Sequence, residues 1–195
     1  MKESALKQAK QRLAAARAAL AEIERADSLS RMEAGWHDLL VAGSTIYAKL
    51  EQGAKGCRLS EMWFAKRKNE RKSDALLNYA HQARNSAEHS IEEVAQGAEI
   101  SVSMTGADLM SGGSFGLVQM PDGQLVPATT GDPTKLRVRG RHVSVVSVRN
   151  RGVTYDPPTM HLGVPVSHDP DDVGRHLLRY LDAMISDADT LARSN

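Results

Sequence analysis

The stretch from Arg84 to His89 contains the residue types that chemistry on a phosphodiester requires. It reads Arg84-Asn85-Ser86-Ala87-Glu88-His89. A guanidinium group neutralises charge on phosphoryl oxygens, best through two hydrogen bonds, and an imidazole transfers protons because its ordinary pKa lies near neutral pH. Arg84 and His89 are therefore candidate catalytic residues. Asn85, one turn before His89, is a candidate for orienting the imidazole or contacting phosphate.

The spacing of arginine and histidine does not select this stretch by itself. Three pairs in the chain have similar spacing: Arg31 and His37, Arg84 and His89, and Arg137 and His142. Small and apolar residues recur around the second pair at positions 76, 80, 83, 87, 91 and 94. On a helix these positions share an arc of about 80°. His81, Asn85 and His89 then lie on the opposite face, turned away from the core.

A simpler structural role remains open for these side chains. Arg84 and Glu88 stand four residues apart, and such a pair on a helix surface contributes only about 0.2–0.5 kcal/mol. Arg31 and His37 are assigned to a packed helix surface near Trp36. Under this interpretation the stretch from Arg84 to His89 is part of a solvated helix face and carries no chemistry.

Four long helices are expected to position these residues. Apolar or small residues recur every three or four positions over 6–23, and a second helix is expected over 29–52. A short helical piece follows at 60–65, and the third long helix is expected over 68–96. The acid-proline-acid sequence Asp169-Pro170-Asp171-Asp172 predicts the start of the fourth long helix.

Residues 100–166 have a different character, with glycine, proline and β-branched runs. A hairpin is expected where Pro121-Asp122-Gly123 separates 115–120 from 124–126. One long strand or two are expected over 136–148.

The fold class is therefore expected to be mainly α. A lone last helix needs a partner for its apolar stripe, so it is expected to return to the first three as a four-helix bundle. The bundle would comprise residues 1–97 and 169–195, and a β-rich insertion between the third and fourth long helices would comprise 98–168.

A long helix carrying Arg84, the polar Asn85 directly after it, and His89 five positions on resembles the HEPN superfamily of nucleotide-binding and RNase domains. The resemblance covers residues 1–97 and 169–192. It implies a bundle with this motif on its third main helix, and two subunits whose motifs line one groove. It also implies RNA cleavage without a metal ion or cofactor, in which the ribose 2′-hydroxyl attacks the adjacent phosphodiester. Arg84, Asn85 and His89 would be the catalytic residues.

The resemblance also suggests partners and a binding surface. His81, Lys68 and Arg71 are candidates for RNA binding. RNA, a second copy of the chain, and a cognate antitoxin or other partner protein are expected, as in bacterial toxin and defence systems. Two alternatives remain: a non-catalytic dimeric helical scaffold that docks other proteins, and a nucleotide-binding module without cleavage.

The composition sets outer bounds on these hypotheses. The 195 residues are 41% hydrophobic and 25% charged, which is typical of one globular domain or one domain with an insert. The single cysteine, Cys57, excludes an internal disulfide and a cysteine-based zinc site. No apolar run reaches the length of a membrane span, and the first residues lack a signal peptide's apolar core. A cytoplasmic protein without membrane contact is expected.

Overall fold

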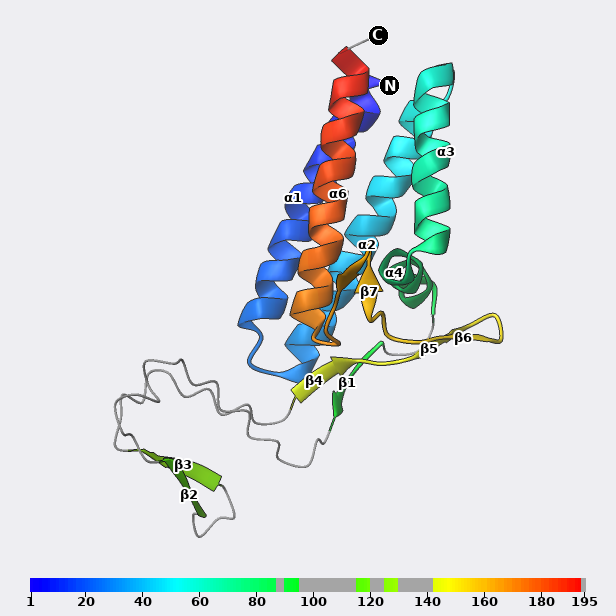
Figure 1. Ribbon diagram of the computed structural model, residues 1–195. Helices are drawn as coiled ribbons and strands as arrows, with labels where there is room; N and C mark the ends of the chain where they lie inside the picture. Colours follow the sequence, from blue (N-terminus) through cyan, green and yellow to red (C-terminus); the bar gives the residue numbers. More distant parts are fainter. Residues whose placement is uncertain (87–89, 95–114, 120–124, 130–141, 194–195) are drawn as a thin grey trace. The chain divides into compact units, whose positions relative to one another are not determined.

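The chain forms two compact units in a computed structural model (Figure 1). The structure describes residues 1–86, 90–94, 115–119, 125–129 and 142–193. The larger unit comprises Met1–Glu93 and Val143–Asn195, and the smaller comprises Val94–His142. The described residues are mainly helical, and their strands lie between Ile91 and Pro165.

The helices of the larger unit are α1 Glu3–Arg25, α2 Leu29–Ala54, α3 Arg58–Ser73, α4 Ala75–Asn85 and α6 Pro170–Arg193. Figure 1 shows α1, α2, α3 and α6 side by side, with α4 lying across their direction. Helix α1 begins and α6 ends at the same end of the unit (Figure 1). The predicted first and second helices and the predicted start of the last helix at Pro170 are confirmed.

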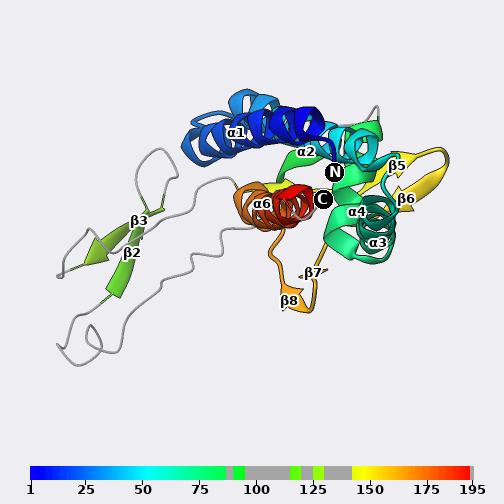
Figure 2. The same cartoon turned by 90° about the horizontal axis from the view of Figure 1, so that it is seen from above.

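One apolar core joins these helices. It includes Leu13 of α1, Leu39 of α2, Leu76 of α4 and Leu181 of α6, all at most 5% exposed. Burying one such side chain contributes about 1.5–3 kcal/mol. Seen from above, α6 lies among the other helices rather than apart from them (Figure 2). The expectation that the last helix packs against the first ones is therefore confirmed.

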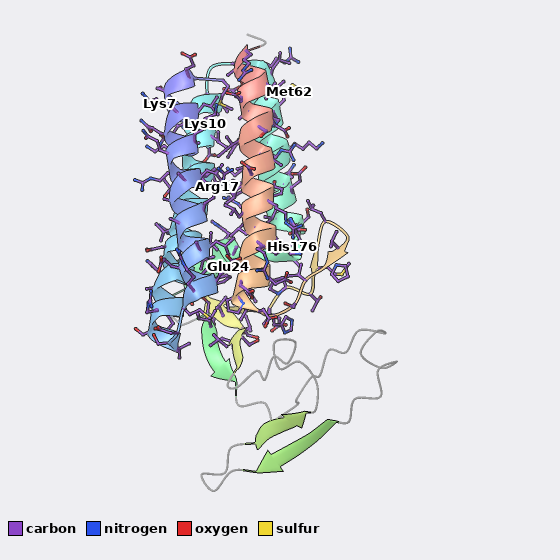
Figure 3. The ribbon with its side chains drawn as sticks, turned by 90° about the vertical axis from the view of Figure 1, so that its left-hand side faces the viewer. Lys7, Lys10, Arg17, Glu24, Met62 and His176 are labelled. Atoms are coloured by element: carbon purple, nitrogen blue, oxygen red, sulfur yellow. The ribbon has the colours of Figure 1, made fainter. Side chains whose placement is uncertain are left out.

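Helices α1 and α6 are joined by ion pairs at heptad spacing. The pairs are Lys10–Asp189 at 2.7 Å, Arg17–Asp182 at 2.8 Å and Glu24–Arg175 at 3.0 Å. Figure 3 shows Lys10, Arg17 and Glu24 in line along α1, beside α6. In the first two pairs the basic residue lies on α1, whereas in the third it lies on α6. Sliding α6 by seven residues would therefore place Asp182 against Glu24, or Arg175 against Arg17. The charges therefore favour one antiparallel register.

Reversing one charge of these α1–α6 ion pairs is expected to lower stability only while the partner residue keeps its own charge. Arg17→Asp would place two carboxylates side by side and destabilise the protein by about 1 kcal/mol, since exposed ion pairs contribute about 0.2–1 kcal/mol. Adding Asp182→Arg restores an ion pair and should recover most of that loss. Urea denaturation of the two single variants and the double variant measures the coupling. Additive effects would show that the pair does not help to set the register.

The predicted helix over 68–96 is wrong, because the chain breaks twice within it. The residue Asp74 has extended backbone (ψ 130°), and its carboxylate accepts the N–H of Leu77 at 3.0 Å, so it ends α3 and caps α4. Helix α4 then ends at Asn85, since Ser86 is also extended and its hydroxyl donates to the Arg149 carbonyl at 3.1 Å. Beyond it, residues 91–94 form a strand.

The short strands of the larger unit pair as β1 Ile91–Val94 with β4 His142–Val145, β5 Val148–Asn150 with β6 Val153–Tyr155, and β7 Met160–His161 with β8 Val164–Pro165. Val145, Val148 and Val166 join the helical core. Residues 143–168, which the sequence assigns to the insertion, therefore pack with the helices. The predicted strand over 136–148 falls partly outside the described residues, and its described part belongs to β4 and β5.

The smaller unit contains the predicted hairpin. Strand β2 Phe115–Gln119 pairs antiparallel with β3 Leu125–Thr129, so that Phe115 lies opposite Thr129 and Gln119 opposite Leu125. The hairpin prediction is confirmed. Across the described residues of both units, no helix is long and apolar enough to cross a membrane.

Candidate functional site

The last turn of α4 brings three predicted site residues together. Arg84 Nη1 donates to Asn85 Oδ1 at 2.9 Å, and Asn85 Nδ2 lies 3.4 Å from His81 Nε2. Since the amide oxygen of Asn85 accepts from Arg84, its NH₂ group faces the imidazole, and an unprotonated Nε2 accepts that hydrogen bond. The expected alignment of His81 with Asn85 is present, and Arg84 is hydrogen-bonded to Asn85.

Arg71, also a predicted binding residue, lies on the other side of His81. Both line a cavity of about 20 Å³, together with Ser44 and Tyr47 of α2. The Arg71 guanidinium stacks 4.6 Å from the centre of the Tyr47 ring, a cation–π contact that fixes its position. The cavity has room for a water molecule or two and no larger group. Arg71 therefore acts on His81 through its charge.

The surroundings of His81 favour its neutral form. Burial lowers the pKa of His81 below its ordinary value, and the positive charges of Arg71 and Arg84 lower it further. Among the described residues, no carboxylate lies within ion-pair distance of Arg71 or Arg84, whereas Arg67 contacts both Glu70 and Asp187. Two arginines, for which the described part of the chain supplies no carboxylate partner, thus contribute to surroundings that disfavour protonation of the His81 imidazole.

Replacing Arg84 with glutamine is expected to raise the pKa of His81. Removing a nearby positive charge makes the protonated imidazole less unfavourable, so half-protonation should occur at a higher pH than in the unchanged protein. NMR titration of the His81 imidazole measures this directly. Arg12→Gln on α1 is the matched control, because Arg12 is exposed and does not contribute to the pKa of His81. An unshifted His81 titration in Arg84→Gln would contradict the electrostatic coupling.

A second pocket, of about 120 Å³, lies beside Arg84. It is lined by Glu33, Trp36, His37 and Leu40 of α2, Ala83, Arg84 and Ser86 at the end of α4, and Ser90 and Ile91. Since one water molecule needs about 10–15 Å³ of such volume, the pocket has room for a group the size of phosphate. Two of these lining residues are joined directly, since the Trp36 indole donates to the Ser90 hydroxyl at 2.8 Å. Leu40 lines both this pocket and the cavity at His81.

The other predicted residues are placed differently. Lys68 lies on α3 and pairs with Glu51 of α2 at 3.2 Å, with both side chains well exposed, and it lines neither pocket. His89 and Glu88 lie outside the described residues. The sequence interpretation missed His37, assigning it to a packed surface, although it lines the pocket at Arg84. Glu33, His37, Leu40 and Ser44 recur on one face of α2, and this spacing was the available signal.

A separate polar cluster anchors the loop before α6. Asp74 Oδ1 lies 2.9 Å from His161 Nδ1, and Asp74 Oδ2 accepts the N–H of Leu162 at 2.8 Å. The His161 ring packs edge-on against His176 and Tyr180 of α6. The Asp74 and His161 side chains are only 8% and 7% exposed. The cluster therefore links the α3–α4 junction to the β7–β8 hairpin, which lies beside α4 (Figures 1 and 2).

Comparisons of the chain with protein-family models, curated proteins and solved structures found no match. The residues described by the structure contain no group of three or more His, Cys, Asp or Glu side chains placed to hold a metal ion.

Proposed function

We propose that the protein is a HEPN-like, metal-independent endoribonuclease or RNA-binding protein of the bacterial toxin or defence type, and that its site is the last turn of α4. The observation that carries this proposal is the pairing of neutral His81 with Arg71 and Arg84, neither of which contacts a carboxylate among the described residues. Such an arrangement suits an anionic ligand and a proton acceptor side by side.

In the proposed reaction each side chain has one task. Arg84, exposed beside its pocket, binds the phosphoryl oxygens and offsets the charge that develops on them. His81 accepts the proton of the ribose 2′-hydroxyl, displacing the long hydrogen bond to Asn85. Asn85 holds the imidazole before substrate binds. The HEPN resemblance gives His89, which lies outside the described residues, a role in proton transfer as well. The 2′-hydroxyl requirement makes RNA, not DNA, the substrate.

The HEPN-like bundle and its homodimer are part of the same proposal. The side-by-side packing of α1, α2, α3 and α6 supports it (Figure 1). In a dimer, the last turns of two α4 helices would line one groove. A cognate antitoxin or other partner protein would act by covering that groove.

Cleavage of a fluorescent oligoribonucleotide in the presence of EDTA tests the proposal. The unchanged protein should produce a 2′,3′-cyclic phosphate and a 5′-hydroxyl, and should leave the 2′-O-methyl oligonucleotide intact. Arg84→Ala and His81→Gln should each lower the rate by about 100-fold or more. Arg12→Ala, an exposed arginine on α1, is the matched control and should cleave normally. RNA binding without cleavage would restrict the function to binding, and neither binding nor cleavage would refute the proposal.

A non-catalytic scaffold is the second candidate, and one observation favours it. Leu59 and Met62 lie one turn apart on α3 and are 60% and 61% exposed. Exposed apolar neighbours are typical of protein–protein contacts. If the scaffold hypothesis holds, Leu59→Ser with Met62→Ser should convert an oligomer to a monomer in analytical ultracentrifugation, and no variant of Arg84 should change any activity.

A further inference from the structure

We propose that His37 of α2 is the general acid of this site, so that one chain supplies both proton-transfer groups. This inference rests on the proposed ribonuclease function. It adds a residue that lies 47 positions before Arg84 and outside its sequence motif.

His37 and Arg84 approach one pocket from two helices. His37 comes from the middle of α2, with its ring exposed, and Arg84 comes from the last turn of α4. The pocket is open to solvent and measures about 120 Å³, so it has room for a phosphate group beside Arg84 and His37, which both line it. His37 is the one imidazole among the described residues that line this pocket.

Arg84 is connected to two histidines. It belongs to the hydrogen-bonded chain Arg84–Asn85–His81, with contacts of 2.9 and 3.4 Å. It also lines one pocket together with His37. Leu40 lines both this pocket and the cavity at His81. Arg84 is thus associated with two imidazoles, the number of proton-transfer groups that paired acid and base catalysis requires.

The two serine hydroxyls that line the pocket are engaged in the fold. The Ser90 hydroxyl accepts the Trp36 N–H, and the Ser86 hydroxyl donates to the Arg149 carbonyl. Neither hydroxyl is acidic enough to protonate an alkoxide at neutral pH. Imidazole is, because its ordinary pKa lies near 6.5. Among the hydroxyl and imidazole side chains that line the pocket, His37 is therefore the one assigned to donate the leaving-group proton.

The two histidines complete a balanced transfer. The 2′-oxygen forms a bond to phosphorus while its proton passes to His81. The bond from phosphorus to the 5′-oxygen breaks, and the electron pair stays on that oxygen, which takes a proton from His37. The products are a 2′,3′-cyclic phosphate and a 5′-hydroxyl, and the two imidazoles exchange protons with water before the next turnover.

Changing the leaving group tests this assignment. An oligonucleotide with sulfur in place of the scissile 5′-oxygen needs no proton donor, because a thiolate leaves unaided. His37→Gln should slow cleavage of the oxygen-linked RNA by about 100-fold or more, and cleavage of the sulfur-linked RNA by less than about tenfold. His81→Gln should slow both substrates. His168→Gln is the matched control, since that histidine is exposed and lines neither pocket.

The outcomes separate the two proposals. If the unchanged protein cleaves RNA and His37→Gln cleaves both substrates at the normal rate, the acid role is overturned and the proposed function stands. Equal slowing of both substrates by His37→Gln also overturns the acid role. If the unchanged protein binds RNA through Arg84 without cleaving it, the acid role fails and RNA binding remains. Thermal unfolding of each variant verifies that the fold is retained.

Discussion

Replacing Asp74 with alanine is expected to destabilise the protein by about 2–4 kcal/mol, because a buried donor left unsatisfied costs about 1–3 kcal/mol and a lost helix cap about 1 kcal/mol. The Asp74 carboxylate accepts three hydrogen bonds, from the backbone of Leu77 and Leu162 and from the imidazole of His161. Alanine would leave the buried His161 ring and the Leu162 N–H unsatisfied and would remove the cap of α4. Urea denaturation followed by circular dichroism measures the loss.

Asp74→Asn is the matched variant. Its side-chain oxygen keeps one acceptor of the right shape, so the cap of α4 survives while the charge is lost. We expect Asp74→Asn to be less stable than the unchanged protein and more stable than Asp74→Ala. If Asp74→Ala unfolds at the same urea concentration as the unchanged protein, the carboxylate does not hold the α3–α4 junction and the β7–β8 hairpin together.

The stabilisation by Asp74 should depend on pH. Burial alone would raise the pKa of Asp74, but the hydrogen bonds from Leu77, His161 and Leu162 outweigh it and hold the pKa below its ordinary value. A carboxyl with a lowered pKa stabilises the fold fully above its unfolded pKa, near 3.9, and loses that contribution as the pH falls through the folded value. The difference in unfolding free energy between the unchanged protein and Asp74→Asn should therefore shrink in acid.

The helices that could be predicted are those with continuous local signals. Both α1 and α2 carry apolar residues every three or four positions, and α6 begins at an acid followed by proline. The prediction of one helix over 68–96 was wrong because a local hydrogen bond at Asp74 interrupts the helix despite the regular spacing of its apolar residues. Asp74 accepts a hydrogen bond only three residues on, a cap that stops one helix and starts the next.

The end of α4 depends on distant residues. The Tyr79 hydroxyl lies 2.6 Å from the Val146 carbonyl, and the Ser86 hydroxyl donates to Arg149. These partners lie more than sixty residues away in the sequence. Helical propensity in this alanine-rich stretch is a weak preference that such tertiary contacts override. The position of Ile91 in a strand was therefore outside the reach of periodicity arguments.

The candidate site was only partly accessible to sequence reasoning. His81, Arg84 and Asn85 belong to one helical turn, so their spacing suffices to bring them together. Arg71 reaches His81 only because the chain breaks at Asp74. His37 shares a pocket with Arg84 only because α2 packs against α4, and no pattern within either helix specifies that packing.

The second large effect is expected from Leu181→Ala in α6. Leu181 is fully buried, and it packs so closely on α2 that a Cβ built at Gly43 would lie 3.4 Å from its Cδ1. Removing the side chain should cost about 2–5 kcal/mol, from lost burial and from the cavity that remains. Ser186→Ala, exposed on the same helix, is the control and should change stability by less than about 0.5 kcal/mol.

Leu181→Ala should also change the candidate site, because Leu181 lines the cavity beside Arg71 and His81. Burial is the largest cause of the lowered pKa of His81, so admitting water there should raise that pKa toward its ordinary value. NMR titration under conditions where the variant is folded measures the shift. A destabilised variant with an unchanged His81 titration would mean that α2 and α4 alone bury the imidazole. A raised pKa would mean that α6 completes the surroundings that keep the pKa of His81 low.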